Sequence, residues 1–588
     1  MFIYIDNKKY PCQEGETVLE VALRHGIEIP HLCYHEDLPL DANCRACLVE
    51  ANGSVMTSCT CKVESGMKVK TDTEEVKRLR QVNLELLLSG HEENCPKCQE
   101  GYFCKTAELM KKYNVTGKKY SRPKIKRPVH KMAQAAEFDP NLCIACNQCV
   151  EMCEDIGINF LRLEGKAAIT AVDYNRDRGV DCIYCGQCTV HCPVSAAREQ
   201  NQIEEVEKAI KDKNKITIVQ CAPSIRCSVG EEFGLEPGTN LTGEIYTALR
   251  KLGFDKIFDV NMGADITTYV EATELAERLK IDETYGRHPA WDGGFIPRSS
   301  SRSESVGGPM FTSCCPGWVK FAEFYHPEIL PHLTTARSPQ IHSGGAYKTW
   351  WAEKQGINPK KIVVVSIMPC TSKKYEARHK KLKVNGMWPV DYVLTTREFA
   401  IMLKKSKIDL PRLKKSDVDR EGIFSGAGAI YGATGGVMES ALRSVHYFIT
   451  GKELKNVEFK KVRGLEKIKT AQVKIGSKIL KVAVAATAKA AEKVIQELKK
   501  NPRAYDYVEV MACPGGCIGG GGQPIPSTER IIAKRIAGLY RIDDKMKLRK
   551  AHQNPVVKDF MENYIAKLPK EKQEQILHTR YSRKKKFR

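Results

Sequence analysis

The chain has 588 residues, which is too many for one hydrophobic core, so several domains are expected. Hydrophobic residues make up 42% and charged residues 28%, an ordinary composition for a soluble globular protein. The start, MFIYIDNKKY, does not resemble a secretory signal, and no 18 apolar residues run together. We therefore expect a cytoplasmic protein without a membrane span.

The formal net charge is +22, which invites a nucleic-acid interpretation. That count treats cysteine as neutral, and thiolates that hold iron would make the balance much less positive. The basic residues are also dispersed, apart from RYSRKKKFR at 580–588. We predict no nucleic-acid partner, and we interpret residues 566–588 as a basic tail that is a solvated end or a docking element.

The 24 cysteines decide the class of protein. A disulfide framework is not expected in a cytosolic chain, because the cytosol keeps thiols reduced. Closely spaced CxxC pairs instead predict a metalloprotein.

Residues 1–78 form the first predicted module, with β-like runs (FIYI, GMKVKT) and one helical segment, TVLEVALRHG. Its cysteines suit the layout of a plant-type [2Fe–2S] ferredoxin, although the outer gaps are wider than usual. A four-cysteine zinc site is the alternative, and Cys61 competes for the last ligand position. The predicted ligands are Cys33, Cys44, Cys47 and Cys59.

Residues 79–125 hold a histidine followed by three cysteines, after the helical run EEVKRLRQVNLELLLSG. The H-x3-C-x2-C-x5-C pattern resembles a histidine-ligated [4Fe–4S] site shared by iron-only hydrogenases and the large iron–sulfur subunit of respiratory complex I. A lone histidine is usually structural, but its position four residues before a CxxC favours a ligand. The implied ligands are His91, Cys95, Cys98 and Cys104.

Residues 126–208 contain an internal repeat of the bacterial two-cluster ferredoxin, in which the fourth cysteine of each run ligates the other cluster. The first run lacks the usual proline after its last cysteine, where Glu154 stands. The cysteine-free stretch 106–142 is predicted to be a linker. The two predicted ligand sets are Cys143, Cys146, Cys149 and Cys192, and Cys182, Cys185, Cys188 and Cys153.

From residue 209 to 565 the pattern changes to short apolar strands that alternate with helical segments. The strands are KITIVQCAPS, FDKIFDVN, KIVVVSIMPC, KVAVAAT and YVEVMACPGG. This alternation predicts an α/β domain with mainly parallel sheets, in which ligands bind beyond the carboxyl ends of strands. Cys370 and Cys513 follow two of these strands.

Three motifs in this domain, TSCCPGW at 312–318, MPCTSKKYE at 368–376 and MACPGGCIGGGGQP at 511–524, strongly resemble the signatures of iron-only ([FeFe]) hydrogenases. The resemblance covers nearly the whole chain. It implies a multidomain α+β and α/β protein, with ferredoxin-like iron–sulfur modules before a two-lobed α/β catalytic domain. At the end of the first module, SCTCKVESGMKVKT also resembles that family, which favours Cys59 over Cys61.

By this resemblance, Cys315, Cys370, Cys513 and Cys517 hold a [4Fe–4S] cubane, and Cys517 bridges to a two-iron subsite that carries CO, cyanide and an azadithiolate. Lys373 matches the lysine that hydrogen-bonds one cyanide. Glycines 519–522 are expected to let the backbone approach the cluster closely. A phosphate loop, the alternative for this run, lacks a following Gly-Lys-Ser/Thr. The other residues implied around the cluster are Pro223, Ser224, Gln340, Met368 and Met511.

The resemblance also implies a proton route that begins at Cys314. Glu271 and Glu274 lie three apart on one helical face and match the carboxylate relay of the family. Thr334 stands where the family has a serine, which keeps the hydroxyl. Without the resemblance, each acid is better interpreted as a surface carboxylate. Arg278 and Glu376 continue the match.

Some features stay unassigned. The stretch 281–309 is longer than in simpler family members, and its Gly, Ser, Pro and Arg content predicts an exposed loop. It either contacts a partner subunit or has no role. The remaining thiols, at Cys12, Cys61, Cys221 and Cys227, are expected to be buried.

The predicted function is reversible H2 oxidation and proton reduction, with electrons carried by one [2Fe–2S] and three accessory [4Fe–4S] clusters. The alternatives are a non-catalytic relative, such as a hydrogen sensor or an iron–sulfur assembly factor, and an electron-transfer subunit. No GxGxxG follows a strand and no Walker loop is present, so NAD(P)H chemistry must sit on another polypeptide. The expected partners are ferredoxin, flavin- or NAD(P)-binding subunits in a hetero-oligomer, and maturation proteins.

Overall fold

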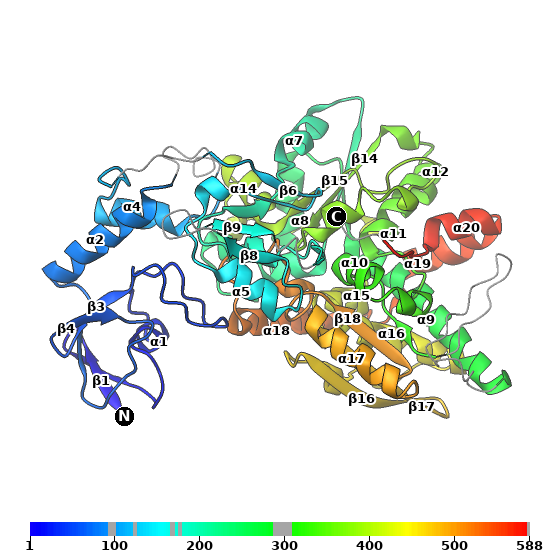
Figure 1. The fold of residues 1–588 in the computed structure, drawn as a ribbon. Coiled ribbons are helices and arrows are strands. Elements are labelled where there is room, and N and C mark those ends of the chain that lie inside the picture. The colour runs from blue at the N-terminus through cyan, green and yellow to red at the C-terminus, as the bar shows by residue number, and fades with distance from the viewer. Residues whose placement is uncertain (92–100, 121–125, 165–170, 175–178, 286–307, 585–588) are drawn as a thin grey trace.

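A computed structural model describes residues 1–91, 101–120, 126–164, 171–174, 179–285 and 308–584. The N-terminal module stands at one end of the molecule, with helices α2 and α4 beside it, and the C-terminal half lies in the large body at the other end (Figure 1).

The N-terminal module is a five-stranded sheet in the order β2-β1-β5-β3-β4, covered by one helix. Helix α1 begins in a capping box, in which Thr17 and Glu20 satisfy each other's backbone N–H groups. Its apolar residues are buried against the sheet. The elements are β1 (Phe2–Ile5), β2 (Lys8–Pro11), α1 (Val18–Arg24), β3 (Leu48–Ala51), β4 (Ser54–Thr57) and β5 (Lys68–Lys70).

The stretch 106–142 is more than a linker, which corrects the sequence prediction. It contains most of α4 and two strands, and these strands form a sheet with β10 in the order β10-β7-β6. The sequence pattern missed these elements because each is short. They are α2 (Glu74–Leu88), α4 (Lys105–Tyr113), β6 (His130–Met132), β7 (Ala136–Phe138) and β10 (Ala197–Glu199).

The two CxxCxxC runs fold alike. Ala145 and Tyr184, each just before the second cysteine of its run, have φ of 51° and 62°. Asn147 and Gly186, each just after that cysteine, have φ of 68° and 73° and begin a helix. The internal repeat in the sequence is thus a structural repeat. Its elements are α5 (Gln148–Asp155), β8 (Leu161–Glu164), β9 (Ala171–Tyr174) and α6 (Gln187–Val190).

The C-terminal half contains two four-stranded sheets. In the first, β12-β11-β14-β15, all neighbours are parallel. In the second, β13-β18-β17-β16, only the β16–β17 pair is antiparallel. The predicted multidomain α+β and α/β class is confirmed. The strands are β11 (Ile216–Cys221), β12 (Lys256–Asp259), β13 (Met310–Phe311), β14 (Ile362–Met368), β15 (Tyr392–Thr395), β16 (Ile468–Ile475), β17 (Lys478–Ala486) and β18 (Tyr507–Met511).

Helices pack around both sheets, and the C-terminal segment packs against these helices. The basic tail predicted at 566–588 is folded in its first part, because it contains a helix whose last residues, Ile576 and Leu577, are buried. Residues 585–588 lie outside the described residues, as does most of the predicted 281–309 loop. The helices are α7 (Ile203–Lys211), α8 (Thr242–Leu252), α9 (Val260–Tyr285), α10 (Pro316–Tyr325), α11 (Pro339–Ala346), α12 (Ala352–Lys354), α13 (Ser372–Glu376), α14 (Thr396–Lys405), α15 (Gly426–Ala429), α16 (Gly436–Thr450), α17 (Ala488–Lys500), α18 (Glu529–Lys545), α19 (Pro555–Lys558) and α20 (Lys570–Leu577).

Candidate active site and electron-transfer centres

Two of the four cysteines in the C-terminal motifs follow strands, one from each sheet, and the other two lie at the starts of helical turns. Strand β14 ends at Met368, two residues before Cys370, and β18 ends at Met511, two residues before Cys513. Cys315 is the N-cap residue of α10, and Cys517 begins a 3₁₀ turn. The motifs therefore meet beyond the carboxyl ends of strands, where α/β sheets bind ligands.

The thiols of these cysteines affect one another's titration. Burial raises the pKa of Cys513, and the charges of Cys370, Cys315 and Cys517 raise it further. Burial likewise raises the pKa of Cys370 to about 11, with Cys315 as the next cause. Four thiols that share one buried space form a soft donor set, which suits an iron–sulfur cluster and releases protons when metal binds.

Two further observations fit a bound cluster. The backbone N–H of Ala512 donates to the Cys315 sulfur at 3.4 Å, and hydrogen bonds to sulfur tune cluster potentials. The buried Ser224 Oγ and Gln340 Oε1 have no hydrogen-bond partner among the described residues. These are the groups expected around the cyanide and CO ligands, and a buried polar atom is costly unless it is paired. Within the described ranges, no three His, Cys, Asp or Glu side chains form a single-ion site.

Lys373 and Glu376 lie together at this pocket. Lys373 Nζ donates to the Cys314 carbonyl at 3.0 Å and to Glu376 Oε2 at 2.9 Å. The same carboxylate oxygen accepts from Gln340 Nε2 at 2.6 Å and from Ser338 Oγ at 2.8 Å. The structure thus places Glu376 beside the lysine, whereas the sequence prediction placed it after Arg278 in the proton route.

The predicted packing residues surround the pocket. Met368, Met511 and Pro223 are buried, and the loop of Pro223 and Ser224 leaves β11. Arg226 fixes this loop, because its Nε donates to the Pro223 carbonyl at 3.0 Å while its Nη2 pairs with the buried carboxylate of Asp259 at 2.8 Å.

Glu271 lies on α9 with no exposed surface. Burial raises its pKa to about 8, and the hydrogen bond from Tyr507 Oη to its Oε1, at 2.7 Å, opposes that rise. Its Oε2 is buried without a partner in the described part of the chain. Burial and the charge of Glu271 are the two leading causes that raise the pKa of Cys314, so these side chains share one electrostatic environment. A carboxyl that titrates near neutral pH suits proton transfer.

Glu274, one helical turn further along α9, is held as a carboxylate. Arg278 Nη2 donates to its Oε1 at 2.8 Å, and Thr334 Oγ1 donates to its Oε2 at 2.7 Å. The Thr335 backbone N–H adds a third bond at 3.0 Å. Burial opposes ionisation, but Arg278 and these donors lower the pKa of Glu274. The structure therefore brings Glu271, Glu274, Thr334 and Arg278 together.

Sequence reasoning missed Tyr507 and Thr335. Tyr507 carried a usable signal, because side chains in a strand alternate and Tyr507 lies four residues before Met511 in β18, on the same face. Thr335 carried none, since it is a hydroxyl residue in a loop after Thr334.

The glycine run is explained by packing between protein segments. A Cβ on Gly521 would lie 2.4 Å from the Gly186 backbone, and one on Gly520 would lie 2.3 Å from the Pro369 carbonyl oxygen. Besides the expected close approach of the backbone to the cluster, glycine is needed at 521 because the chain there lies against the two-cluster module, and at 520 because it lies against Pro369.

The cysteines of that module form two groups across the repeat. Burial raises the pKa of Cys149 well above its usual value, and Cys146, Cys143 and Cys192 follow as causes. Burial also raises the pKa of Cys188, followed by Cys182 and Cys153. Backbone N–H groups donate to the sulfurs of Cys143, Cys153, Cys182 and Cys192 at 3.3–3.4 Å.

In the first module, Cys59 faces the other three cysteines. Its pKa is raised by a side-chain hydrogen bond to Cys47 and by burial, and then by the charges of Cys47, Cys33 and Cys44. The pKa of Cys61 is raised by burial and by Glu64. Cys61 is buried apart from the group, and Cys12, Cys221 and Cys227 are buried as well.

The histidine-ligated site is described only in part, because Cys95 and Cys98 lie outside the described residues. His91 follows α2, with its backbone N–H bonded to the Leu88 carbonyl at 2.9 Å, and Cys104 is the N-cap residue of α4. Ser195 Oγ, in the two-cluster module, donates to the Phe103 carbonyl at 2.6 Å.

Hydrogen bonds join neighbouring modules close to their cysteines. Gln148 Nε2 donates to the Leu32 and Tyr34 carbonyls at 3.0 and 3.2 Å, and Asn43 Nδ2 donates to the Ala145 carbonyl at 2.6 Å. These bonds hold the first module beside the first CxxC run.

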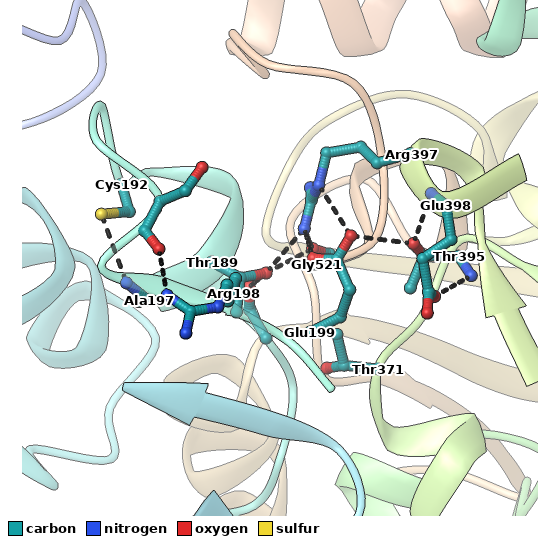
Figure 2. A network of polar contacts seen from close by, with 12 residues as sticks. Thr189, Cys192, Ala197, Arg198, Glu199, Thr371, Thr395, Arg397, Glu398 and Gly521 are labelled. Atoms are coloured by element: carbon teal, nitrogen blue, oxygen red, sulfur yellow. Dashed lines mark hydrogen bonds and ion pairs between the residues drawn. The ribbon is translucent and has the colours of Figure 1, made fainter. Parts of the chain in front are cut away.

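The second CxxC run is fixed to the catalytic pocket by Arg397, as Figure 2 shows. Its guanidinium pairs with Glu199 of β10 and donates to Thr189 Oγ1 at 3.0 Å and to the Gly521 carbonyl at 2.9 Å. Thr189 Oγ1 also donates to the Gly521 carbonyl, at 2.6 Å. Burial and the charge of Cys513 are the two leading causes that raise the pKa of Cys185. The cysteine group that contains Cys185, here called the proximal group, is therefore adjacent to the cysteines of the C-terminal motifs.

None of the helices in the described residues is long and apolar enough to cross a lipid bilayer.

Comparison with known proteins adds independent evidence. Family models match at residues 215–521 (iron-only hydrogenase large subunit, C-terminal domain), 2–74 (2Fe-2S iron-sulfur cluster binding domain), 142–196 (4Fe-4S dicluster domain) and 529–584 (iron hydrogenase small subunit). The chain is 38% identical to NADP-reducing hydrogenase subunit HndD of Solidesulfovibrio fructosivorans, over 100% of this chain and 99% of that protein. It is 38% identical to iron hydrogenase 1 of Clostridium pasteurianum, over 99% and 100%.

Among solved structures, a variant of [FeFe]-hydrogenase HydA1 from Chlamydomonas reinhardtii matches with a TM-score of 0.55 at 34% identity, over 65% of this chain and 98% of that one. The small-subunit match falls on the C-terminal segment that packs against the catalytic domain, so both parts lie in one polypeptide here. On these grounds the chain belongs to the iron-only hydrogenase family, whose members are oxidoreductases.

Proposed function

We propose that this protein catalyses the reversible interconversion of H2 with protons and electrons. The observation that carries the proposal is the pocket itself, in which three buried cysteines and the half-buried Cys517 meet Lys373 and Cys314 next to the Glu271–Glu274 carboxylates. Ligands and acid–base groups in one place are what this reaction needs.

Cys315, Cys370, Cys513 and Cys517 would hold the cubane of the H-cluster, and Cys517 would link it to the two-iron subsite. When bound, this cluster would supply the redox-active metal centre for H2 chemistry and a basic group beside it. Lys373 would donate to one cyanide, while Ser224 would contact the other.

The chain's own residues then move the proton. Cys314 passes it to Glu271, whose raised pKa lets it bind and release a proton near neutral pH. Glu274, held ionised by Arg278 and Thr334, exchanges it towards solvent. This order follows the contacts of two residues on α9. Glu271 shares an electrostatic environment with Cys314, and Glu274, one turn further along, is bonded to Arg278 and Thr334.

We propose that the upstream cysteines hold one [2Fe–2S] and three [4Fe–4S] clusters, with His91 as a ligand, and that these form the electron path. Its support is the contact between modules at Gln148 and at Arg397. The likeness to a subunit of an NADP-reducing hydrogenase favours electron exchange with ferredoxin and with an NAD(P)-linked partner in a hetero-oligomer. Placement in the cytoplasm stays a prediction.

The test is infrared spectroscopy of the matured protein. CO and cyanide bands that respond to added H2 are expected. A protein that binds a full complement of iron but shows no such bands would instead support the alternative, a non-catalytic relative. Purification from the native cell as a lone active chain, with ferredoxin as sole partner, would contradict the hetero-oligomer.

A further inference from the structure

The C-terminal segment after α20 runs beside the proton route. Its backbone is anchored there, because Ala336 and His578 form an antiparallel bridge and the Thr579 N–H donates to the Thr335 carbonyl at 2.8 Å. Arg337 Nε also donates to the His578 carbonyl at 2.9 Å. These bonds use backbone atoms of His578, so its imidazole is free for another purpose.

That imidazole reaches Glu274 through one hydroxyl. His578 Nδ1 lies 2.8 Å from Thr335 Oγ1, and Thr335 Oγ1 donates to Glu274 Oε2 at 3.4 Å. The second contact is longer than the about 2.6–3.2 Å of a formed catalytic hydrogen bond, but such bonds are often long before substrate binds and then tighten. A continuous path therefore joins the carboxylate to the imidazole.

Arg278, the charged partner of Glu274, does not serve this purpose. Arg278 is bonded to the carboxylate, but a guanidinium keeps its protons at all ordinary pH values and cannot relay one. Its contribution is to keep Glu274 ionised. Glu274 and His578 are both half-buried, and the segment that carries His578 becomes exposed two residues later, at Arg580. Histidine is also the side chain that titrates near neutral pH.

We propose that His578 exchanges protons between solvent and Glu274 through the Thr335 hydroxyl, as the outer end of the proton route. This inference rests on the proposed function. For proton uptake, the imidazole accepts a proton from water at Nε2 and gives its Nδ1 proton to the Thr335 oxygen. Thr335 gives its own proton to Glu274, and exchange with water then restores the starting tautomer. H2 oxidation runs the same steps in reverse, so no charge is left behind.

The surroundings of His578 suit this role. Burial lowers its pKa, Glu274 on α9 and Glu574 on α20 oppose that change, and Arg337 reinforces it. The imidazole is therefore neutral at neutral pH, the form in which one ring nitrogen donates and the other accepts.

The first experiment measures turnover of the matured full chain with His578→Ala, His578→Gln and Thr335→Val. Each is expected to lose activity on the order of 10²-fold, as for other positioned acid–base groups. Glutamine keeps a donor towards Thr335 but cannot titrate. Added imidazole should restore turnover in His578→Ala, and it should fail in Thr335→Val, where the hydroxyl bridge is gone.

His552 supplies a matched control, because its ring also bonds a hydroxyl and a carboxylate, Ser444 and Glu453, but away from the route. Any loss in His552→Ala should not respond to imidazole. Undiminished turnover in His578→Ala, or full activity in His578→Gln, would overturn the proposal, because the residue would then be dispensable or merely structural.

A second readout needs no activity. In the full chain prepared without the two-iron subsite, isotope-labelled histidine lets infrared titration follow His578, assigned by its loss in His578→Gln. Glu274→Gln should lower the titration midpoint of His578, since the carboxylate raises it; an unchanged midpoint would refute the coupling. If the matured wild type fails to react with H2, the proposed function fails, and this titration still reports on His578.

Discussion

Tyr507→Phe isolates the hydrogen bond that tunes Glu271. The hydroxyl donates to Oε1 at 2.7 Å, and both side chains are fully buried, so phenylalanine removes the donor with little change in shape. A hydrogen bond to a charged group contributes about 1.5–3 kcal/mol, and one pKa unit corresponds to about 1.4 kcal/mol. The pKa of Glu271, about 8 in the wild type, should therefore rise by roughly one to two units.

The direction of the pH effect follows from the role of Glu271. In H2 oxidation it must be ionised to accept a proton, so activity grows as the pH rises through its pKa. The rising limb of the pH profile should move to higher pH by the same one to two units. Two assays check this: dye-linked H2 oxidation against pH, and infrared titration of the Glu271 carboxyl band, assigned with Glu271→Gln.

Tyr505→Phe is the matched control, because Tyr505 Oη donates to Glu497 at 2.8 Å near the surface and away from the route. It should leave the pH profile unchanged. A carboxyl band in Tyr507→Phe that titrates at the wild-type midpoint would refute the reasoning, since it would mean that the hydrogen bond does not set this pKa.

Three further predictions concern the pocket and its junction with the two-cluster module. In Cys314→Ala, iron content should be normal while turnover collapses; near-normal turnover would remove this thiol from the proton route. Gly521→Ala places a Cβ 2.4 Å from the Gly186 backbone, so it should cost about 1–3 kcal/mol, seen as a lower melting temperature. Arg397→Met leaves the buried Glu199 carboxylate unpaired, so it should cost about 3–5 kcal/mol and should alter the magnetic-resonance signal of the proximal cluster.

Lys404→Met is the control for the Arg397 prediction, because Lys404 forms an exposed pair with Glu232 at 2.8 Å. A surface pair of this kind contributes about 1 kcal/mol or less. Equal destabilisation by the two variants would contradict the assignment of Arg397 as the buried link between modules.

The sequence alone determined the class of protein. Cysteine spacing is set by local backbone geometry, so the repeat at 143–192 could be recognised, and both copies adopt the same left-handed turns. Apolar strands such as IVVVSIM are equally local, and they predicted β14 and the position of Cys370 at its carboxyl end.

Tertiary structure decided what depends on distant segments. The hydrogen bond between Tyr507 and Glu271 joins residues 236 positions apart, and Arg397 reaches Glu199 across 198. Nothing in either local sequence encodes such a pairing. The same holds for His578, which lies in the stretch that composition alone predicts to be a basic tail. The spacing of cysteines along the sequence predicts the cluster ligands. Proton routes and module junctions depend instead on which side chains meet once the chain is packed.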